Sequence, residues 1–151
     1  MGPAKVAVLL AALELGKRCA EQPLTRRNVM SSPSQTRRFL QHHLAMQTRE
    51  IFCCLLLDAQ HRLLRCTDLF MGTIDGAAVY PREVVAQALR FRAAAVIVAH
   101  NHPSGVVVPS DADKRLTARL REALALVDLR LLDHLIIGRG NCYSFAEHGL
   151  L

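Results

Sequence analysis

The sequence has no tryptophan, and aromatic residues make up only 5% of the chain. The core must therefore be built mainly from aliphatic side chains, and no aromatic platform for stacking nucleobases is visible. Hydrophobic residues make up 51% and charged residues 21% of the 151 residues, which is ordinary for a globular protein and argues against disorder. This length is enough for one compact domain with a real core.

The sequence also lacks a hydrophobic run long enough to cross a membrane. Residues 6–13 are apolar, but the run is too short for a span and continues into residues 14–18, which is typical of a helix. The five cysteines form an odd set without any Cys-x-x-Cys spacing, which favours reduced, mostly buried thiols. We therefore expect a cytoplasmic protein without a secretion or membrane signal.

No run of five or more like charges occurs, although the net charge is +6 and the isoelectric point is about 9.5. This charge permits contact with nucleic acid or another anionic surface. The basic residues are spread along the chain, however, and a small basic domain without such a partner explains the charge more simply.

Hydrophobic patterning predicts interleaved helices and strands. The expected helices are 4–20, 34–44, 81–92 and 110–127, and the expected strands are 50–57, 62–67, 94–100, 129–137 and 142–145. This order predicts an α/β (α+β) fold with a mixed β-sheet flanked by helices. Residues 22–34 are expected to be a polar connection. Residues 1–45 are expected to form an α-helical lead-in that is not an independent domain, ahead of a domain at residues 46–151.

The most informative motif is His-Asn-His-Pro-Ser-Gly at residues 100–105, directly after the apolar run 94–99. Alternate residues of a strand point the same way, so His100 and His102 should present both imidazoles to one side. A carboxylate from the next element could complete a site with two His and one carboxylate. Such a set leaves a fourth position open on tetrahedral zinc, which distinguishes catalytic from structural zinc.

Ser110 and Asp113 have the spacing of a helix N-capping box. Capping alone explains both residues. Beside the histidine pair, Asp113 could instead be the third metal ligand, and the Ser110 hydroxyl could both cap the helix and point into the site.

Glu50 precedes the apolar strand 51–57. If that strand neighbours the one ending at His100, the Glu50 carboxylate could act as a general base on a metal-activated water. The alternative is a solvated residue in front of a strand.

Together these residues resemble the JAMM metalloprotease motif, also called JAB or MPN-plus, with a distant Glu, then His-x-His-Pro, then Ser and Asp. The similarity is closer still to the RadC-like family and covers roughly residues 3–151. The matching segments are residues 49–52, 56–58, 72–73, 81–84, 99–105, 109–113 and 132–138.

The resemblance implies a JAB/MPN fold, similar to the cytidine-deaminase arrangement. It implies one Zn²⁺ per chain, bound by His100, His102 and Asp113. By the same resemblance, Glu50 would be the general acid/base and Ser110 would stabilise the oxyanion. Longer members carry a helix-hairpin-helix-like region ahead of a linker helix, and this chain begins at what resembles that linker helix.

The leading hypothesis is a zinc metallopeptidase or isopeptidase acting on an unknown protein or peptide substrate. The alternative is a DNA repair-associated accessory or DNA-binding protein of the RadC family without peptidase turnover. A nucleobase deaminase is set aside because that chemistry needs a Cys-x-x-C motif, which the chain lacks.

The remaining histidines are assigned no chemistry. His134 is expected to be half-buried and hydrogen-bonded, and a role in orienting a metal ligand is the alternative. Four others lack partners at useful spacing and are expected at the surface: His42, His43, His61 and His148. The loop 106–108 is more apolar than the family resemblance suggests, which could change what docks at the site.

Overall fold

The computed structural model describes residues 1–26, 29, 33–72 and 79–151. Over these residues the elements follow the predicted alternation. They are α1 (Pro3–Arg26), α2 (Pro33–Leu44), β1 (Ile51–Leu57), β2 (Leu63–Met71), α3 (Pro81–Arg90), β3 (Ala95–Asn101), α4 (Asp111–Ala125), β4 (Arg130–Ile137) and β5 (Cys142–Ser144). None of the described helices is both long and apolar enough to cross a membrane.

The strands form one sheet in the order β2-β1-β3-β4-β5. β3 and β4 run parallel, joined by the crossover helix α4, while β1–β2, β1–β3 and β4–β5 are antiparallel. Every residue of β1 and β3 is buried, as expected for central strands covered on both faces. The predicted α/β fold with a mixed sheet is therefore confirmed.

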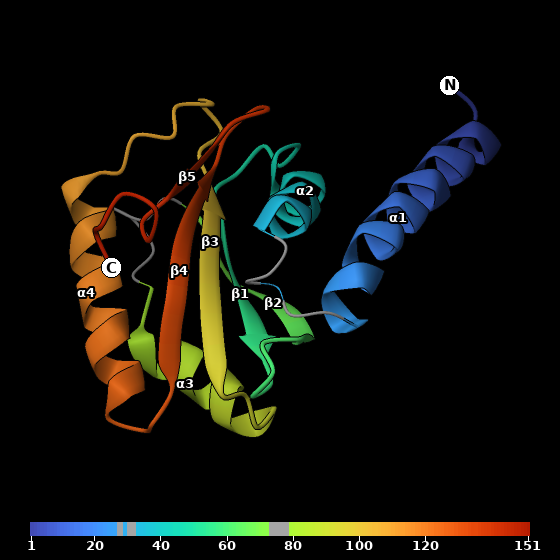
Figure 1. The fold of residues 1–151 in the computed structure, drawn as a ribbon. Helices are drawn as coiled ribbons and strands as arrows, with labels where there is room; N and C mark the ends of the chain where they lie inside the picture. Colours follow the sequence, from blue (N-terminus) through green and yellow to red (C-terminus); the bar gives the residue numbers. More distant parts are fainter. Residues whose placement is uncertain (27–28, 30–32, 73–78) are drawn as a thin grey trace.

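Helices cover both faces of the sheet (Figure 1). α2 packs on one face, where Phe39 and Leu40 meet the odd-numbered residues of β1. α3 and α4 pack on the other face, where Val84 and Leu120 join a second core cluster with the even-numbered residues of β1. Because side chains of β1 alternate between the two faces of the sheet, the core has two separate halves, and polar side chains can cluster in each half independently.

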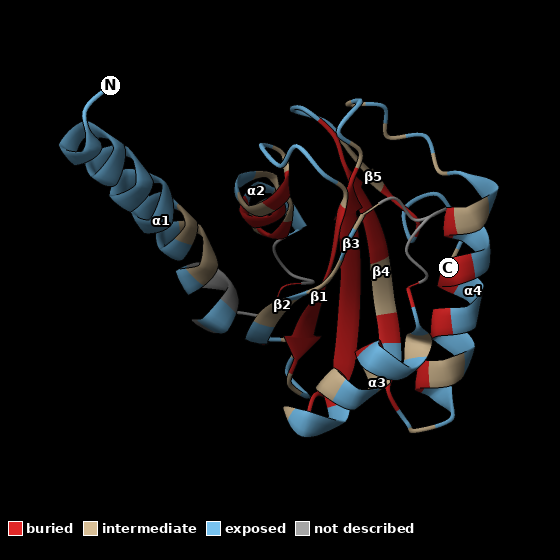
Figure 2. Ribbon diagram, turned by 180° about the vertical axis from the view of Figure 1, so that it is seen from behind, coloured by how far each residue is buried: buried red, intermediate tan, exposed pale blue. Residues whose placement is uncertain are grey.

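α1 lies outside these layers, and its N-terminal end stands away from the sheet (Figure 2), while Ala20 near its other end packs against the α2 side of the core. Most of its described side chains are exposed, including Leu13 at 69% and Val8 at 68%. The helix is longer than predicted. It continues through Pro23 to Arg26, where a polar connection was expected, and the Thr25 hydroxyl donates to the Gln22 carbonyl in its last turn. Pro23 has no amide hydrogen, so the helix continues past it with one backbone hydrogen bond fewer.

Two other details differ from the sequence-based expectations. β2 extends to Met71, four residues beyond the predicted strand. Within the predicted helix 81–92, the helical spacing of Leu89 places it with Val84 and Ala88 on the expected core face, but Leu89 is 54% exposed because only Val84 and Ala88 form the buried stripe of α3. The sequence also places Gly72 and Gly76 in a loop or short strand after the predicted strand 62–67; Gly72 follows β2 with φ of 144°, and position 76 lies outside the described residues.

Candidate metal centre

His100 and His102 present their imidazoles to one side of the sheet, as the alternation of β3 predicts. Their Nε2 atoms lie 3.0 Å apart. His100 is fully buried at the end of β3, and His102 follows the strand, with its amide donating to the Ile137 carbonyl. Gly105 then turns the chain at φ +83°, a conformation that glycine adopts without strain.

Glu50 joins this pair because β1 runs antiparallel to β3. Phe52 pairs directly with His100, so the residue just before β1 reaches the end of β3 that carries the histidines. Ligand atoms of Glu50, His100 and His102 all lie within 4.8 Å of one another. The strand adjacency that the general-base hypothesis required is therefore present.

Asp113 approaches from the first turn of α4. The capping box is confirmed: Ser110 Oγ accepts from the Asp113 amide, and Asp113 Oδ2 accepts from the Ser110 amide and hydroxyl. The other oxygen, Oδ1, lies 3.4 Å from His100 Nε2. Within the described part of the chain this buried oxygen makes no hydrogen bond. One carboxylate oxygen thus serves the cap and the other faces the histidines, so capping and metal binding are compatible.

A buried hydrogen-bond chain sets the tautomer of His100. The Thr117 hydroxyl donates to the Asp113 carbonyl at 2.7 Å and lies 2.6 Å from His134 Nδ1. Since that hydroxyl has only one hydrogen, it must accept from Nδ1–H of His134. His134 Nε2 then accepts from His100 Nδ1–H across 2.9 Å. The lone pair of His100 Nε2 is consequently directed into the site.

His102 has the same tautomer for a different reason. Its Nδ1 lies 2.6 Å from the Val106 carbonyl, which can only accept, so Nδ1 carries the hydrogen. Burial lowers the pKa of His100 to about 4, with Asp113 acting to raise it and His102 to lower it further. Burial also holds the pKa of His134 well below its usual value. The neutral His100 ring therefore directs its Nε2 lone pair toward His102 Nε2, and a cation held between the two nitrogens would be stabilised by that lone pair.

The donor set matches a tetrahedral metal ion along the two edges that include His100 Nε2. Zinc–nitrogen distances of about 2.0–2.1 Å place two ligand atoms of a tetrahedron about 3.3 Å apart. The separations of 3.0 Å between the histidine nitrogens and 3.4 Å from His100 Nε2 to Asp113 Oδ1 are close to that edge. His134 supplies the outer hydrogen bond that orients a ligating histidine. These residues can hold a metal ion of the zinc type.

Asn101 and Thr117 support the site and were not predicted from the sequence. The Asn101 side chain accepts from the Ile51 amide and donates to the Arg49 carbonyl, so it holds the backbone on both sides of Glu50. For Asn101, the position between the two histidines is the sequence feature that could have indicated a role in the site. Nothing in the sequence marks Thr117, because its role depends on the packing of α4 against β4.

Two expectations for histidines are corrected. His134 is fully buried rather than half-buried, and it has the geometry of the alternative reading, a residue that orients a ligand. His43 is not an unpartnered surface residue: it bonds Asp68 and stacks on Phe39 with ring centroids 5.9 Å apart. The physical reason is that α2 lies against the sheet and directs this face of its last turn inward.

The fold and the site define an α/β domain whose mixed sheet carries a histidine and carboxylate cluster at the ends of two adjacent central strands. Comparison with known families agrees, because residues 30–150 match the family model described as RadC-like JAB domain. The chain belongs to this family.

Three similar proteins share the description UPF0758. The chain is 55% identical to a UPF0758 protein of Marinobacter nauticus and 54% identical to one of Aeromonas hydrophila, over its whole length and 67% of theirs. It is also 55% identical to a UPF0758 protein of Nitrosococcus oceani, with the same coverage.

Proposed function

We propose that this domain is a zinc-dependent hydrolase that cleaves an amide or isopeptide bond in a protein or peptide. The observation that supports it best is the pair of imidazoles with Nε2 atoms 3.0 Å apart, beside a buried carboxylate oxygen 3.4 Å from one of them. His100, His102 and Asp113 would hold the ion. A bound zinc ion would supply a Lewis acid and lower the pKa of a water molecule toward neutrality.

Glu50 would be the proton carrier. Its carboxylate lies with the two histidine nitrogens in one group within 4.8 Å, close enough to reach a water molecule held there. It would accept a proton from the attacking water and deliver it to the leaving amine. The Asn101 bonds on both sides of Glu50 keep the backbone of this residue fixed during the transfer.

Ser110 would stabilise the negative charge that develops on the attacked carbonyl oxygen. Its hydroxyl hydrogen is directed to Asp113 Oδ2 at 2.7 Å. Donation to substrate therefore requires the hydroxyl to turn, while the Ser110 backbone amide keeps its own bond to that oxygen.

The surface beside the site favours an apolar group on the substrate. Val106 and Val108 are 57% and 69% exposed, and the Val106 carbonyl binds His102 directly. A substrate side chain that covers these valines would gain hydrophobic stabilisation next to the reacting atoms.

The experiment combines metal analysis with cleavage assays on the full chain. By mass spectrometry, His102→Ala and Asp113→Asn should each lose about one zinc per chain, whereas Glu50→Gln should retain it. Quenched fluorescent peptides and lysine-ε-linked peptides serve as substrates, and Glu50→Gln should lower kcat roughly 10²–10⁴-fold. Unchanged zinc in both ligand variants, or full activity in Glu50→Gln, would refute the assignment.

A further inference from the structure

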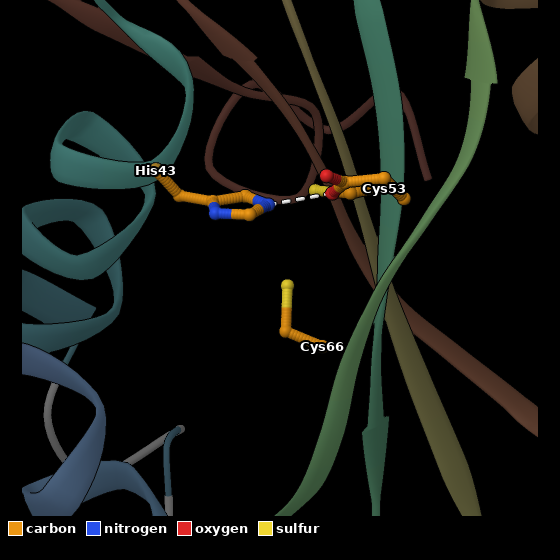
Figure 3. A group of neighbouring side chains, drawn as sticks. His43, Cys53 and Cys66 are labelled. Carbon is orange, nitrogen blue, oxygen red and sulfur yellow. Dashed lines mark hydrogen bonds and ion pairs between the residues drawn. The ribbon is translucent and has the colours of Figure 1, made fainter. Parts of the chain in front are cut away.

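A second cluster of metal-ligand side chains lies on the opposite face of the sheet. It consists of His43 from α2, Cys53 from β1, and Cys66 and Asp68 from β2, and we refer to it as the thiol cluster. One ligand atom of each residue lies within 4.8 Å of every other. Figure 3 shows His43 reaching from its helix toward the strand of Cys53, with the Cys66 sulfur directed into the same space.

The sheet register brings three of these residues to one face. Cys53 pairs directly with Asp68, and Cys66 pairs with Leu55, the next residue of β1 on that face. The register shifts between Phe52 and Cys53, because Phe52 pairs with Phe70 and Leu69 has no partner. This bulge places Asp68 on the α2 face while Phe70 stays on the other face, against Phe52.

Burial and hydrogen bonding hold the side chains of the thiol cluster in fixed orientations. Cys53 is fully buried, the His43 side chain is 8% exposed, and Asp68 closes the cluster toward solvent with its side chain 41% exposed. His43 Nε2 bonds Asp68 Oδ1, and its ring is fixed by stacking on Phe39. All four side chains come from helices or strands, which hold metal ligands more firmly than loops do.

Zinc would bind the two sulfurs of the thiol cluster as thiolates. The deprotonated sulfur, not the thiol, is the form that binds a metal ion.

We propose that His43, Cys53, Cys66 and Asp68 form a structural zinc site. Two sulfurs, one imidazole nitrogen and one carboxylate oxygen are ligands that zinc accepts in tetrahedral geometry, and four protein ligands leave no open position for catalysis. The ion would link α2 to the β1–β2 hairpin on the face opposite the candidate catalytic site. This structural site is therefore additional to the proposed hydrolase activity and does not depend on it.

A disulfide between Cys53 and Cys66 is the main competing arrangement. The two residues are diagonal neighbours rather than a direct pair, since Cys53 faces Asp68. Diagonal positions of an antiparallel pair are about 7–8 Å apart, and cysteines with Cα atoms beyond about 7 Å are not bridged without backbone movement. The register therefore favours a shared ion over a bond between the sulfurs.

Cobalt substitution tests the proposal because the thiol cluster offers two sulfur ligands, whereas the ligands proposed for the candidate metal centre are nitrogen and oxygen atoms. The full chain is purified under a non-thiol reductant and titrated with Co²⁺, and thiolate coordination is detected as a near-ultraviolet charge-transfer band. We expect this band in the wild-type protein and in His102→Ala, which removes a ligand of the other site only. Cys66→Ser and Asp68→Asn should each weaken or abolish the band and lose about one metal ion per chain.

Matched controls lie beside each ligand. Cys54→Ala changes the adjacent cysteine on the other face of β1, and His42→Ala changes the exposed neighbour of His43; both should keep the band. The Asp68 side chain is 41% exposed and outside the apolar core, so its variant should fold even if a core cysteine variant does not. No charge-transfer band in the folded wild-type protein would overturn the proposal, as would a band unchanged in Asp68→Asn and Cys66→Ser. A Cys53–Cys66 disulfide under these conditions would do the same.

Discussion

Replacing Thr117 by valine tests the tautomer chain that directs the His100 lone pair into the candidate metal centre. Valine keeps the shape of threonine but cannot accept a hydrogen bond from His134 Nδ1–H. The Asp113 carbonyl retains its helical amide partner, so His134 is the one group left unsatisfied. An orphaned buried donor costs about 1–3 kcal/mol of folding free energy.

The same change should also weaken metal binding, although Thr117 touches no proposed ligand nitrogen. If His134 moves its hydrogen to Nε2, it can no longer accept from His100 Nδ1. His100 then carries its hydrogen on Nε2, the atom assigned to the metal. Loss of an outer-shell partner typically reduces metal affinity about 10–100-fold, which corresponds to about 1.4–2.7 kcal/mol.

Both effects can be measured in a Cys66→Ser background, where the thiol cluster does not compete for the ion. Zinc affinity is determined by competition with a chromophoric chelator, and stability of the metal-free protein by urea unfolding. Thr117→Ser, which keeps the hydroxyl, should remain close to the parent in both assays. A Thr117→Val protein that binds zinc as tightly as its Thr117→Ser counterpart would refute the role of the chain.

Three further predictions concern the surroundings of the two sites. Asn101→Ala should lower kcat in the cleavage assay while zinc stays bound, because it releases the backbone around Glu50; unchanged kcat would contradict this role. Gly138→Ala should cost about 1–3 kcal/mol in urea unfolding, since a Cβ there would lie 2.6 Å from a backbone oxygen, whereas Gly16→Ala on open α1 should not destabilise. Burial raises the pKa of Cys54 to about 12, so iodoacetamide at pH 8 should label it only after unfolding, as peptide mass spectrometry would show.

Much of the fold follows from hydrophobic patterning. β1 and β3 are seven-residue buried strands, and their continuous apolar runs are the pattern that central strands of a covered sheet require. The end of α1 was missed because a proline and nearby polar residues usually mark a connection, whereas the helix tolerates Pro23 in its last turn. Residue patterns therefore predict the presence of a strand or helix more reliably than they predict the residue at which it ends.

The candidate metal centre could be predicted where its residues share a motif or a spacing. His100 and His102 follow from strand alternation, and Ser110 with Asp113 follows from the capping pattern, which the structure contains. The support from Asn101 and Thr117 could not be predicted. Both depend on contacts between elements far apart in the sequence, namely α4 with β4 and β3 with the start of β1.

The thiol cluster shows a different limit. In a regular strand Asp68 and Phe70 would share a face, and the sequence offers no sign that Leu69 is bulged. The bulge separates them, so Asp68 meets His43 and Phe70 packs with Phe52. A metal site that needs a bulge and a helix contact cannot be found from residue spacing alone.

The two sites share β1 but not its face, and this arrangement explains how they can act independently. Phe52 pairs with His100 on the α4 side, while Cys53, the next residue, points to α2. Because all residues of β1 are buried, a slip by one residue would exchange the two faces and destroy both sites together. An ion bound by the thiol cluster would oppose that slip, since it fixes Cys53 to β2 and α2 only three residues beyond Glu50. Substitutions that remove the thiol cluster should therefore leave zinc binding at the His100 site intact in the folded protein. The loss of the thiol cluster should appear instead as a lower free energy of unfolding.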